Sequence, residues 1–318
     1  MPTEQVTSRV EFVTVAPDQG GQRIDNFLLR HLKGVPKTLI YRILRKGEVR
    51  VNKGRIKPDY RVQAGDEIRI PPIRRSLDEK RPPSNRSVDV LSDRILYEDE
   101  RLIIVNKPAG MAVHGGSGVS HGIIETMRHW RQDLHYLELV HRLDRETSGC
   151  LVLAKKRSAL RQLHELLREG QVEKRYLALV KGPWSHGRQR VELALQKNVL
   201  RSGERMVNVD EEGKVAVSTF IPLAVGKQAS LMEIHIETGR THQIRVHAAH
   251  LDHPIAGDDK YGDKEFNRQM QAAGLTRLFL HARSLAFTLM EPHKDIAVNA
   301  PLDKELTQLL DKLGLQTE

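Results

Sequence analysis

The residues with the clearest chemical potential lie in one short segment, His141 to Gly149, which reads His-Arg-Leu-Asp-Arg-Glu-Thr-Ser-Gly. Asp144 stands between two arginines, Arg142 and Arg145. A carboxylate with guanidinium neighbours is suited to acid, base or nucleophilic chemistry because its charge is balanced. The structural alternative is a surface turn in which Asp144 only forms a stabilising ion pair, since such pairs also perturb carboxylates. The residues alone leave both interpretations open.

Two apolar runs flank this segment, and they are the elements that must position it. They extend from Leu137 to Val140 and from Cys150 to Ala154, and both have the length and composition of buried strands. A loop between two buried strands has a fixed position. We therefore expect the Asp144 carboxylate to be held in place by the core beneath it.

A second polar cluster follows about a hundred residues later, from Glu237 to His247, and contains Arg245 and Ile244. The pattern predicts a turn at Thr238 and Gly239 that leads into a short helix with Ile244 on its inner side. Histidines at positions 242, 247, 250 and 253 suggest a metal site. Histidines that cap the helix or face a bound ligand are favoured over metal-binding histidines, because no His-Glu-x-x-His spacing and no cysteine accompanies them.

The stretch from Val172 to Gly182 reads as a strand and carries Tyr176. On its own, a tyrosine in a strand is usually a half-buried core residue. Earlier in the chain, a buried strand from Leu102 runs into a Pro-Gly turn after Lys107, and His114 follows. Lys107 and His114 are expected to support the Asp144 loop or to contact a bound ligand, and neither is assigned a catalytic role.

These stretches resemble the motifs of the RluA family of RNA pseudouridine synthases. The segment from His141 fills every fixed position of the pattern H-R-L-D-x-x-T-S-G, and residues 239–247 match G-R-T-H-Q-I-R-V-H throughout. Residues 174–182 are similar to K-x-Y-x-A-x-V-x-G, and residues 107–110 to K-P-x-G. Cys150 stands where an aliphatic residue is expected, a departure that affects packing rather than chemistry.

The resemblance implies a catalytic role for three residues and a supporting role for two more. Asp144 is the essential carboxylate, and Arg245 pairs with it and keeps it charged. Tyr176 packs on the target base with its hydroxyl placed to handle a proton. Ile244 forms the apolar floor beneath that base, and Arg142 fills the gap left when the uridine leaves its stack.

The implied reaction is the isomerisation of uridine to pseudouridine, in which the C1′–N1 bond breaks, the uracil rotates, and C5 bonds to C1′. No atoms enter or leave, so the resemblance implies neither a cofactor nor a metal. The residues leave three routes open for Asp144: attack at C6, attack at C1′, or removal of a ribose proton. They also leave open which uridines are modified, because target choice depends on RNA shape and loop contacts.

The first quarter of the chain predicts a basic accessory module. Residues 1–75 contain 16 Lys and Arg against 8 Asp and Glu, while the remainder contains 35 against 33, within a total net charge of +10. Two short amphipathic helices and three strands, near residues 10–15, 49–52 and 67–70, are expected here, and residues 20–70 resemble the S4 RNA-binding module. Seven cations are candidates for one phosphate-binding face: Arg23, Lys37, Arg42, Arg45, Lys46, Lys53 and Arg55.

The expected organisation is an S4-like module over residues 1–75, a Pro-rich linker over 76–90, and a catalytic domain over 91–318. The expected class is α+β, with a mixed, largely antiparallel sheet and flanking helices in the catalytic domain. Within the family, the module and the wording of the motifs point to the type that modifies ribosomal RNA of the large subunit.

Composition narrows the setting. Hydrophobic residues make up 39% of the chain and charged residues 29%, which suits a soluble globular protein. A lone cysteine, no apolar leader and no apolar run of membrane length indicate a cytoplasmic protein without a membrane partner, and a monomer is the default. The competing functions are a catalytically silent RNA-binding protein, a hydrolase using Asp144 and a histidine, and a metalloenzyme.

Overall fold

The structure is a computed structural model that describes residues 4–6, 9–32, 35–76, 82–116, 121–199, 205–290 and 293–315. The chain divides into two compact units, residues 1–81 and 82–318. Each unit has its own hydrophobic core, and each is described by itself.

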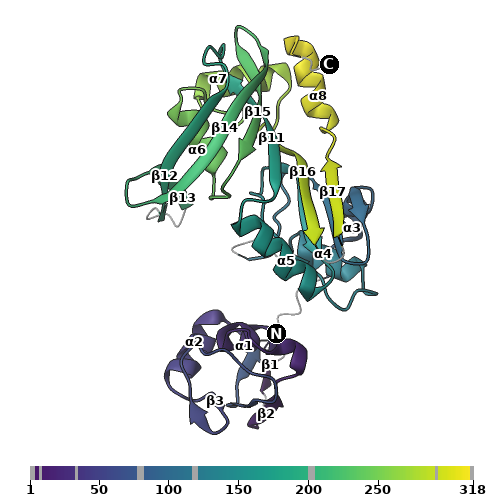
Figure 1. Cartoon of the computed structure of the whole chain (residues 1–318), viewed down its shortest axis with the longest axis vertical. Helices are drawn as coiled ribbons and strands as arrows, with labels where there is room; N and C mark the ends of the chain where they lie inside the picture. The colour runs from purple at the N-terminus through teal and green to yellow at the C-terminus, as the bar shows by residue number, and fades with distance from the viewer. Residues whose placement is uncertain are drawn as a thin grey trace. The chain divides into compact units, whose positions relative to one another are not determined.

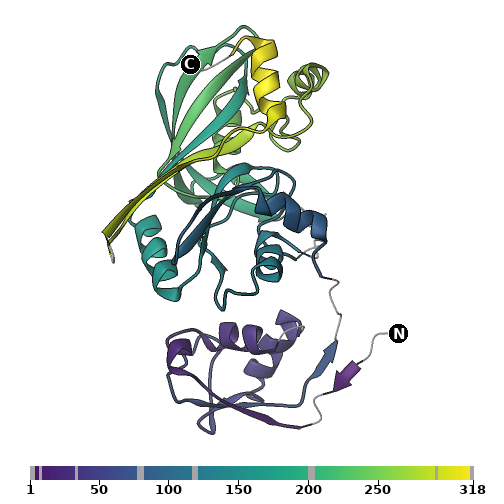
Figure 2. The ribbon, with the colours of Figure 1, turned by 90° about the vertical axis from the view of Figure 1, so that its right-hand side faces the viewer.

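The N-terminal unit packs two helices on a four-stranded antiparallel sheet. The helices are α1 (Ile24–His31) and α2 (Lys37–Arg45), and Figure 2 shows them on one side of the sheet. The sheet has the order β2 (Glu11–Thr14), β5 (Glu67–Ile70), β3 (Arg50–Val51), β4 (Gly54–Arg55). A short 3-10 helix follows β2 (Pro17–Gln19), and a separate two-stranded pair joins β1 (Glu4–Val6) to β6 (Arg74–Ser76).

The core of this unit follows from the alternation and helical spacing of its apolar residues. Ile40 and Ile43 of α2 are buried against Leu28 of α1 and Ile68 of β5. The β3–β4 hairpin turns through Asn52 and Lys53, both with positive φ, as a tight two-residue hairpin requires. The two expected helices and the strand at 67–70 are therefore present.

The expected linker over residues 76–90 is wrong in its second half. Helix α3 (Asn85–Ser92) begins there, because Ser84 caps it by accepting a hydrogen bond from the Ser87 amide. Leu91 of α3 is fully buried in the core of the second unit, so the helix belongs to that unit. Residues 77–81 of the expected linker lie outside the described residues.

The second unit is organised around a sheet of eleven described strands. The main path runs β13 (Arg205–Val209), β12 (Gln189–Val199), β14 (Lys214–Val225), β15 (Ala229–Ile236), β11 (Glu173–Lys181), β16 (Leu280–Met290), β10 (Ser148–Ala154), β8 (Leu102–Lys107), β7 (Ile95–Glu98). Off this path, β17 (His293–Asn299) pairs with β16 and β9 (Glu138–Leu139) with β10. Figure 1 shows β12, β14, β15 and β11 side by side. Strands β10 and β16 pair in parallel, and the other described pairs of this sheet are antiparallel.

Helices cover this sheet: α4 (Ile123–Trp130), α5 (Arg157–Arg168), α6 (Gln243–His250), α7 (Lys264–Ala273) and α8 (Lys304–Leu313). The α+β class and the mixed, largely antiparallel sheet expected from the sequence are confirmed. Among the described residues, no helix combines the length and apolar character needed to cross a membrane.

Candidate active site

One pocket of the second unit brings together the catalytic candidates. Its lining includes Asp144 from the loop before β10, Tyr176 from β11, and Ile244 and Arg245 from α6. Arg142 also lines it. These residues come from stretches separated by up to a hundred positions, and the sheet brings them to one place. The Asp144 side chain remains 22% exposed, so a ligand can reach its carboxylate.

The Asp144 loop is fastened to the turn that follows β8. The fully buried Lys107 ammonium donates to the carbonyls of Pro108, Met111 and Arg145 at 2.8–2.9 Å. In addition, the Gly110 amide donates to the Arg145 carbonyl and the Arg145 guanidinium returns a bond to the Gly110 carbonyl. Burial lowers the pKa of Lys107 to about 7, against the opposing pull of nearby carboxylates. Lys107 therefore supports the loop, as the sequence suggested.

The two ends of the segment are fixed by buried groups. His141 Nε2 accepts the Val152 amide at 3.2 Å, and burial lowers the His141 pKa to about 4. At the other end, the Ser148 hydroxyl lies 2.8 Å from His281 Nδ1 and accepts from Arg277. Gly149 has φ +108° and lies so close to the Ala282 backbone that an added Cβ would be 2.2 Å from the Ala282 carbonyl oxygen. The small residues of the motif thus serve the close parallel pairing of β10 with β16.

Arg245 does not form the expected ion pair with Asp144. Its Nε and Nη2 atoms donate to the two carboxylate oxygens of Asp258 at 2.7 and 2.6 Å, and both side chains are buried. Burial works against the charge on Arg245, but the bonds to Asp258 raise the Arg245 pKa. The sequence could not show this partner, because Asp258 lies in a loop thirteen residues further on. Asp144 still acts on Arg245 electrostatically from across the pocket.

The ionisable group in closest charge contact with Asp144 is His242. Its Nε2 lies 3.9 Å from Asp144 Oδ2, and its Nδ1 lies 2.8 Å from the Tyr261 hydroxyl. Tyr261 also accepts the Val207 amide, so the hydroxyl proton is free to be donated to His242. That donation leaves the imidazole proton on Nε2, the nitrogen that faces Asp144. Burial lowers the His242 pKa, which favours this neutral form.

His242 also has an unusual backbone. It is the N-cap of α6 with φ 55° and ψ 15°, a left-handed conformation that costs a non-glycine residue about 1–3 kcal/mol. The expected turn at Thr238 and Gly239 is held by Gln243, whose carbonyl accepts the Thr238 hydroxyl and the Arg240 amide. Strain of this kind concentrates at functional sites, and here it orients an imidazole towards the carboxylate.

Tyr176 and Ile244 supply the less polar part of the pocket. They are 9% and 5% exposed. Burial, with the Asp144 charge as a second cause, raises the pKa of the Tyr176 hydroxyl, which keeps it protonated. Arg142 is exposed at the pocket rim. A neighbouring groove shares Arg142 with this pocket and is lined by Lys197, Lys214 and Arg240 together with Glu212 and uncharged residues.

The histidines of this region have separate environments. His247 is fully buried, and His253 Nδ1 lies 2.7 Å from the Lys181 carbonyl. Over the described ranges, no group of three or more His, Cys, Asp or Glu side chains is arranged to hold a metal ion. Cys150 is buried, as expected, and burial raises its pKa to about 12.

The N-terminal cations fall on different parts of their unit. Lys37, Arg42 and Arg45 are exposed on α2, and Lys46 follows directly, near Glu48. Lys53 lies in the β3–β4 turn.

Arg23 differs from the other cations. Its guanidinium donates twice to the buried Asp25 carboxylate, at 2.7 and 3.1 Å. Its role as a phosphate-binding cation stays a prediction: Nε and Nη2 are used inside the unit, while the side chain is 43% exposed.

Two residues of the site were missed by sequence reasoning, Asp258 and Tyr261. Both lie in a loop that reads Gly-Asp-Asp-Lys-Tyr-Gly after His253-Pro254. Asp258 holds Arg245 and accepts the Lys260 and Tyr261 amides. The available signal was an acid and a tyrosine in a loop beside glycines, which is common in ordinary turns.

The comparisons with known proteins agree with this architecture. Residues 101–250 match the family described as RNA pseudouridylate synthase, and residues 22–68 match the S4 domain. A human structure, RNA pseudouridylate synthase domain containing 4, is similar with a TM-score of 0.61 and 28% identity, covering 73% of this chain and 97% of that one. The human domain-containing 1 protein shares the fold, with a TM-score of 0.56. The fold and pocket thus define an RNA pseudouridine synthase, an isomerase, with an S4 module.

Curated relatives are similar over nearly the whole length. Ribosomal large subunit pseudouridine synthase C of Pasteurella multocida (strain Pm70) is 55% identical, over 98% of this chain and 96% of the relative. The protein of that name from Escherichia coli (strain K12) is 54% identical, over 98% and 99%. The chain belongs to the ribosomal large subunit pseudouridine synthase C family.

Proposed function

We propose that this enzyme converts uridines of large-subunit ribosomal RNA to pseudouridine with Asp144 as its catalytic carboxylate. The names of the relatives support the RNA target. The observation that carries the assignment of Asp144 is its place: an accessible carboxylate on a rigid loop, in one pocket with Tyr176, Ile244 and Arg245.

The reaction requires the C1′–N1 bond to break and a C5–C1′ bond to form. The proton that leaves C5 is balanced by one gained at N1, so the product is an isomer. A uridine in folded RNA must first leave its stack, at a cost of a few kcal/mol. Arg142 lines the pocket, where its side chain could fill the gap that the uridine leaves in the RNA stack.

Inside the pocket, each residue has a task that its chemistry permits. Ionised Asp144 acts on the sugar or the base as nucleophile or base, and the His242 Nε2–H is aimed at it. Tyr176 stays protonated and can donate a hydrogen bond to the detached uracil. Arg245, fixed by Asp258, provides a positive charge that does not move during the reaction. Ile244 offers an apolar surface on which the uracil can rotate.

The test is the Asp144→Asn variant assayed on large-subunit ribosomal RNA. We expect pseudouridine formation to disappear while RNA binding persists, because the amide is nearly isosteric but cannot ionise. Normal turnover by the variant would refute the role of Asp144. Release of free uracil by the unsubstituted enzyme would instead indicate a hydrolase, and loss of its activity with a chelator would indicate a metalloenzyme.

We propose that the enzyme works in the cytoplasm. We also propose that it is a monomer and needs no cofactor. Sedimentation of the full chain with and without RNA tests the monomer directly. A stable dimer without RNA would contradict it.

A further inference from the structure

The outer face of the N-terminal sheet carries a row of side chains that the catalytic pocket does not use. In the antiparallel register, Phe12 of β2 lies opposite Arg69 of β5, Arg69 opposite Arg50 of β3, and Arg50 opposite Arg55 of β4. Directly opposed residues project to the same face of a sheet. We call Phe12, Arg69, Arg50 and Arg55 the arginine row; it crosses all four strands.

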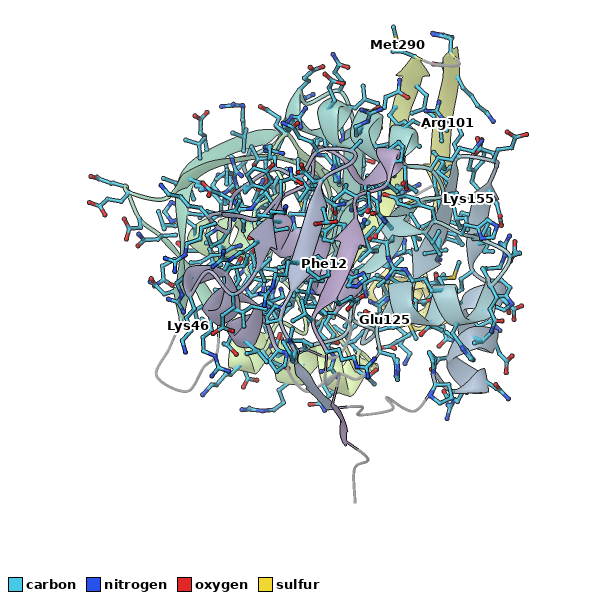
Figure 3. The ribbon with its side chains drawn as sticks, turned by 90° about the horizontal axis from the view of Figure 1, so that it is seen from below. Phe12, Lys46, Arg101, Glu125, Lys155 and Met290 are labelled. Atoms are coloured by element: carbon cyan, nitrogen blue, oxygen red, sulfur yellow. The ribbon has the colours of Figure 1, made fainter. Side chains whose placement is uncertain are left out.

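This face points away from the core, because its neighbours in each strand point inward. Val51 and Ile68, which alternate with members of the row, are buried against the helices. Phe12 is 60% exposed, Arg50 and Arg55 are exposed, and Arg69 is half-buried. Figure 3 labels Phe12 on the front of β2.

The row is costly for the isolated unit. Like charges directly opposite each other on a sheet are destabilising, and here Arg50 has an arginine on both sides. Arg69 donates to the Glu48 carbonyl, which leaves its charge uncompensated. An acidic side chain on this face, Glu67, lies one row further along β5, opposite Thr14. A bound polyanion would relieve the repulsion between the three guanidinium groups.

Protection of sheet edges does not explain the pattern. Edge strands are usually blunted by charged residues, and exposed aromatics are avoided there. In this sheet the edge strand β2 carries the exposed phenylalanine, whereas two of the arginines lie on the central strands β5 and β3. Edge protection can account for Arg55 on the other edge strand, β4, but not for the two central arginines or for the exposed Phe12.

We propose that the arginine row is a second RNA-binding surface, which takes a single-stranded segment of the same RNA. An unpaired base would stack on Phe12, while the guanidinium groups contact successive phosphates. Neighbouring strands are about 4.8 Å apart, so the row extends over about 14 Å. Guanidinium groups suit phosphate oxygens, and any base can stack on an aromatic ring. The proposal rests on the proposed function for its choice of RNA. It adds the aromatic Phe12 and the cations Arg50 and Arg69 to the RNA-binding residues expected from the sequence.

Binding to a short oligouridine, measured with the full chain carrying Asp144→Asn to prevent turnover, tests the stacking contact. We expect Phe12→Ala to weaken binding at least about fivefold, the lower bound for a lost base–aromatic stack. Phe12→Tyr keeps the ring and should bind normally. Phe12→Ala should weaken binding to a duplex RNA of the same length much less than it weakens binding to the single strand. Equal losses on single strand and duplex would overturn the stacking contact.

The salt dependence of binding tests the arginines. Arg50→Gln combined with Arg55→Gln should lower the slope of log affinity against log salt by about 1.4, since each single-strand phosphate contact contributes about 0.7. Arg9→Gln with Lys57→Gln removes the same charge from exposed positions outside the row and should leave the slope nearly unchanged. Equal effects of the two pairs, or no effect of the first, would overturn the proposal.

The two proposals fail separately. Pseudouridine formation is measured with the unsubstituted chain on ribosomal RNA. If no product forms while the row variants still lose oligouridine binding, the proposed function is refuted and the surface stands. If product forms and the row variants bind as the parent does, the surface is refuted, and an acidic protein becomes the partner to examine.

Discussion

The His242 side chain is held by a residue that lies nineteen positions further along the chain, Tyr261. The Tyr261 hydroxyl accepts a hydrogen bond from the Val207 amide and lies 2.8 Å from His242 Nδ1. This hydroxyl therefore connects strand β13 to the imidazole beside Asp144. The Arg245 guanidinium lies over the Tyr261 ring, 5.1 Å from its centroid. Tyr261 is therefore a positioning residue for both charged neighbours of Asp144.

Tyr261→Phe keeps the ring under Arg245 and removes only the hydroxyl. We expect kcat to fall about 10- to 100-fold, because His242 loses the bond that fixes its tautomer and orientation. KM for RNA should change little, since Tyr261 is not among the residues that line the pocket. Single-turnover and steady-state rates of pseudouridine formation separate the two effects.

A matched control is Tyr97→Phe, which removes another hydrogen-bonded hydroxyl of the same unit, the one that donates to Asp99 away from the pocket. His242→Gln combined with Tyr261→Phe should be no slower than His242→Gln alone, because residues that act as one unit are not additive. A fully additive double variant would show that Tyr261 does not act through His242.

The site residues show which contacts could be predicted from the sequence and which could not. Motif matching placed Asp144, Tyr176, Ile244 and Arg245 together, and the pocket contains all four. It assigned Arg245 the wrong partner because ion pairing depends on where a later loop folds back. A motif states which residue types occur together, whereas the Asp258 carboxylate is brought to Arg245 only by the tertiary structure.

Among the elements, the junction of β10 with β16 positions the Asp144 loop. The two strands run parallel at residues 148–149 and 281–282, although most of the sheet is antiparallel. A parallel pair between strands so distant in sequence leaves no local signal. The sequence therefore predicted the strand over residues 150–154 but not its pairing with β16. What the sequence did contain is the glycine at which the strands approach most closely.

Gly149→Ala should destabilise the second unit by about 3 kcal/mol or more. The added methyl group would meet the Ala282 backbone, and the residue has positive φ. Gly182→Ala is the matched control: Gly182 also has positive φ, but nothing lies within 4 Å of its added Cβ. Urea unfolding followed by tryptophan fluorescence compares the two, since Trp130 and Trp184 both belong to this unit. Equal losses would mean that backbone strain alone, and not the close approach, requires the glycine.

The short elements were predictable for a different reason. Both N-terminal helices show helical spacing of apolar residues, and strand β5 occupies the expected residues Glu67–Ile70. Helix α3 was missed because it is polar except for a few apolar residues, of which Leu91 is buried. Its stability comes from packing on the second unit, and a polar helix held by tertiary contacts does not show in sequence periodicity.

In the molecule as a whole, the two units should differ in their stability towards acid, because buried histidines are present in the second unit. His247 and His281 are fully buried in the second unit, and burial lowers the pKa of each from 6.5 to about 4. Between these values the unfolded chain binds protons that the folded chain does not, so stability falls as the pH drops from about 6.5 to 4. Protonation of each histidine lowers the free energy of unfolding by about 3 kcal/mol over this range. The described N-terminal residues include one histidine, His31, which is partly exposed beside Glu11.

We therefore expect acid to unfold the second unit first, seen as a loss of native tryptophan fluorescence near pH 5 while amide signals of residues 9–76 persist in NMR spectra. His247→Leu should move the midpoint to lower pH. Neither ring nitrogen of His247 has a hydrogen-bond partner among the described residues, so its replacement removes a proton-binding group without breaking a bond. We expect His281→Leu to lower the midpoint pH less than His247→Leu does, because it also breaks the hydrogen bonds to Ser148 and to the Ala300 carbonyl. An unchanged midpoint in His247→Leu would show that other groups govern acid unfolding, and simultaneous loss of both units would show that the N-terminal unit depends on the second for its stability.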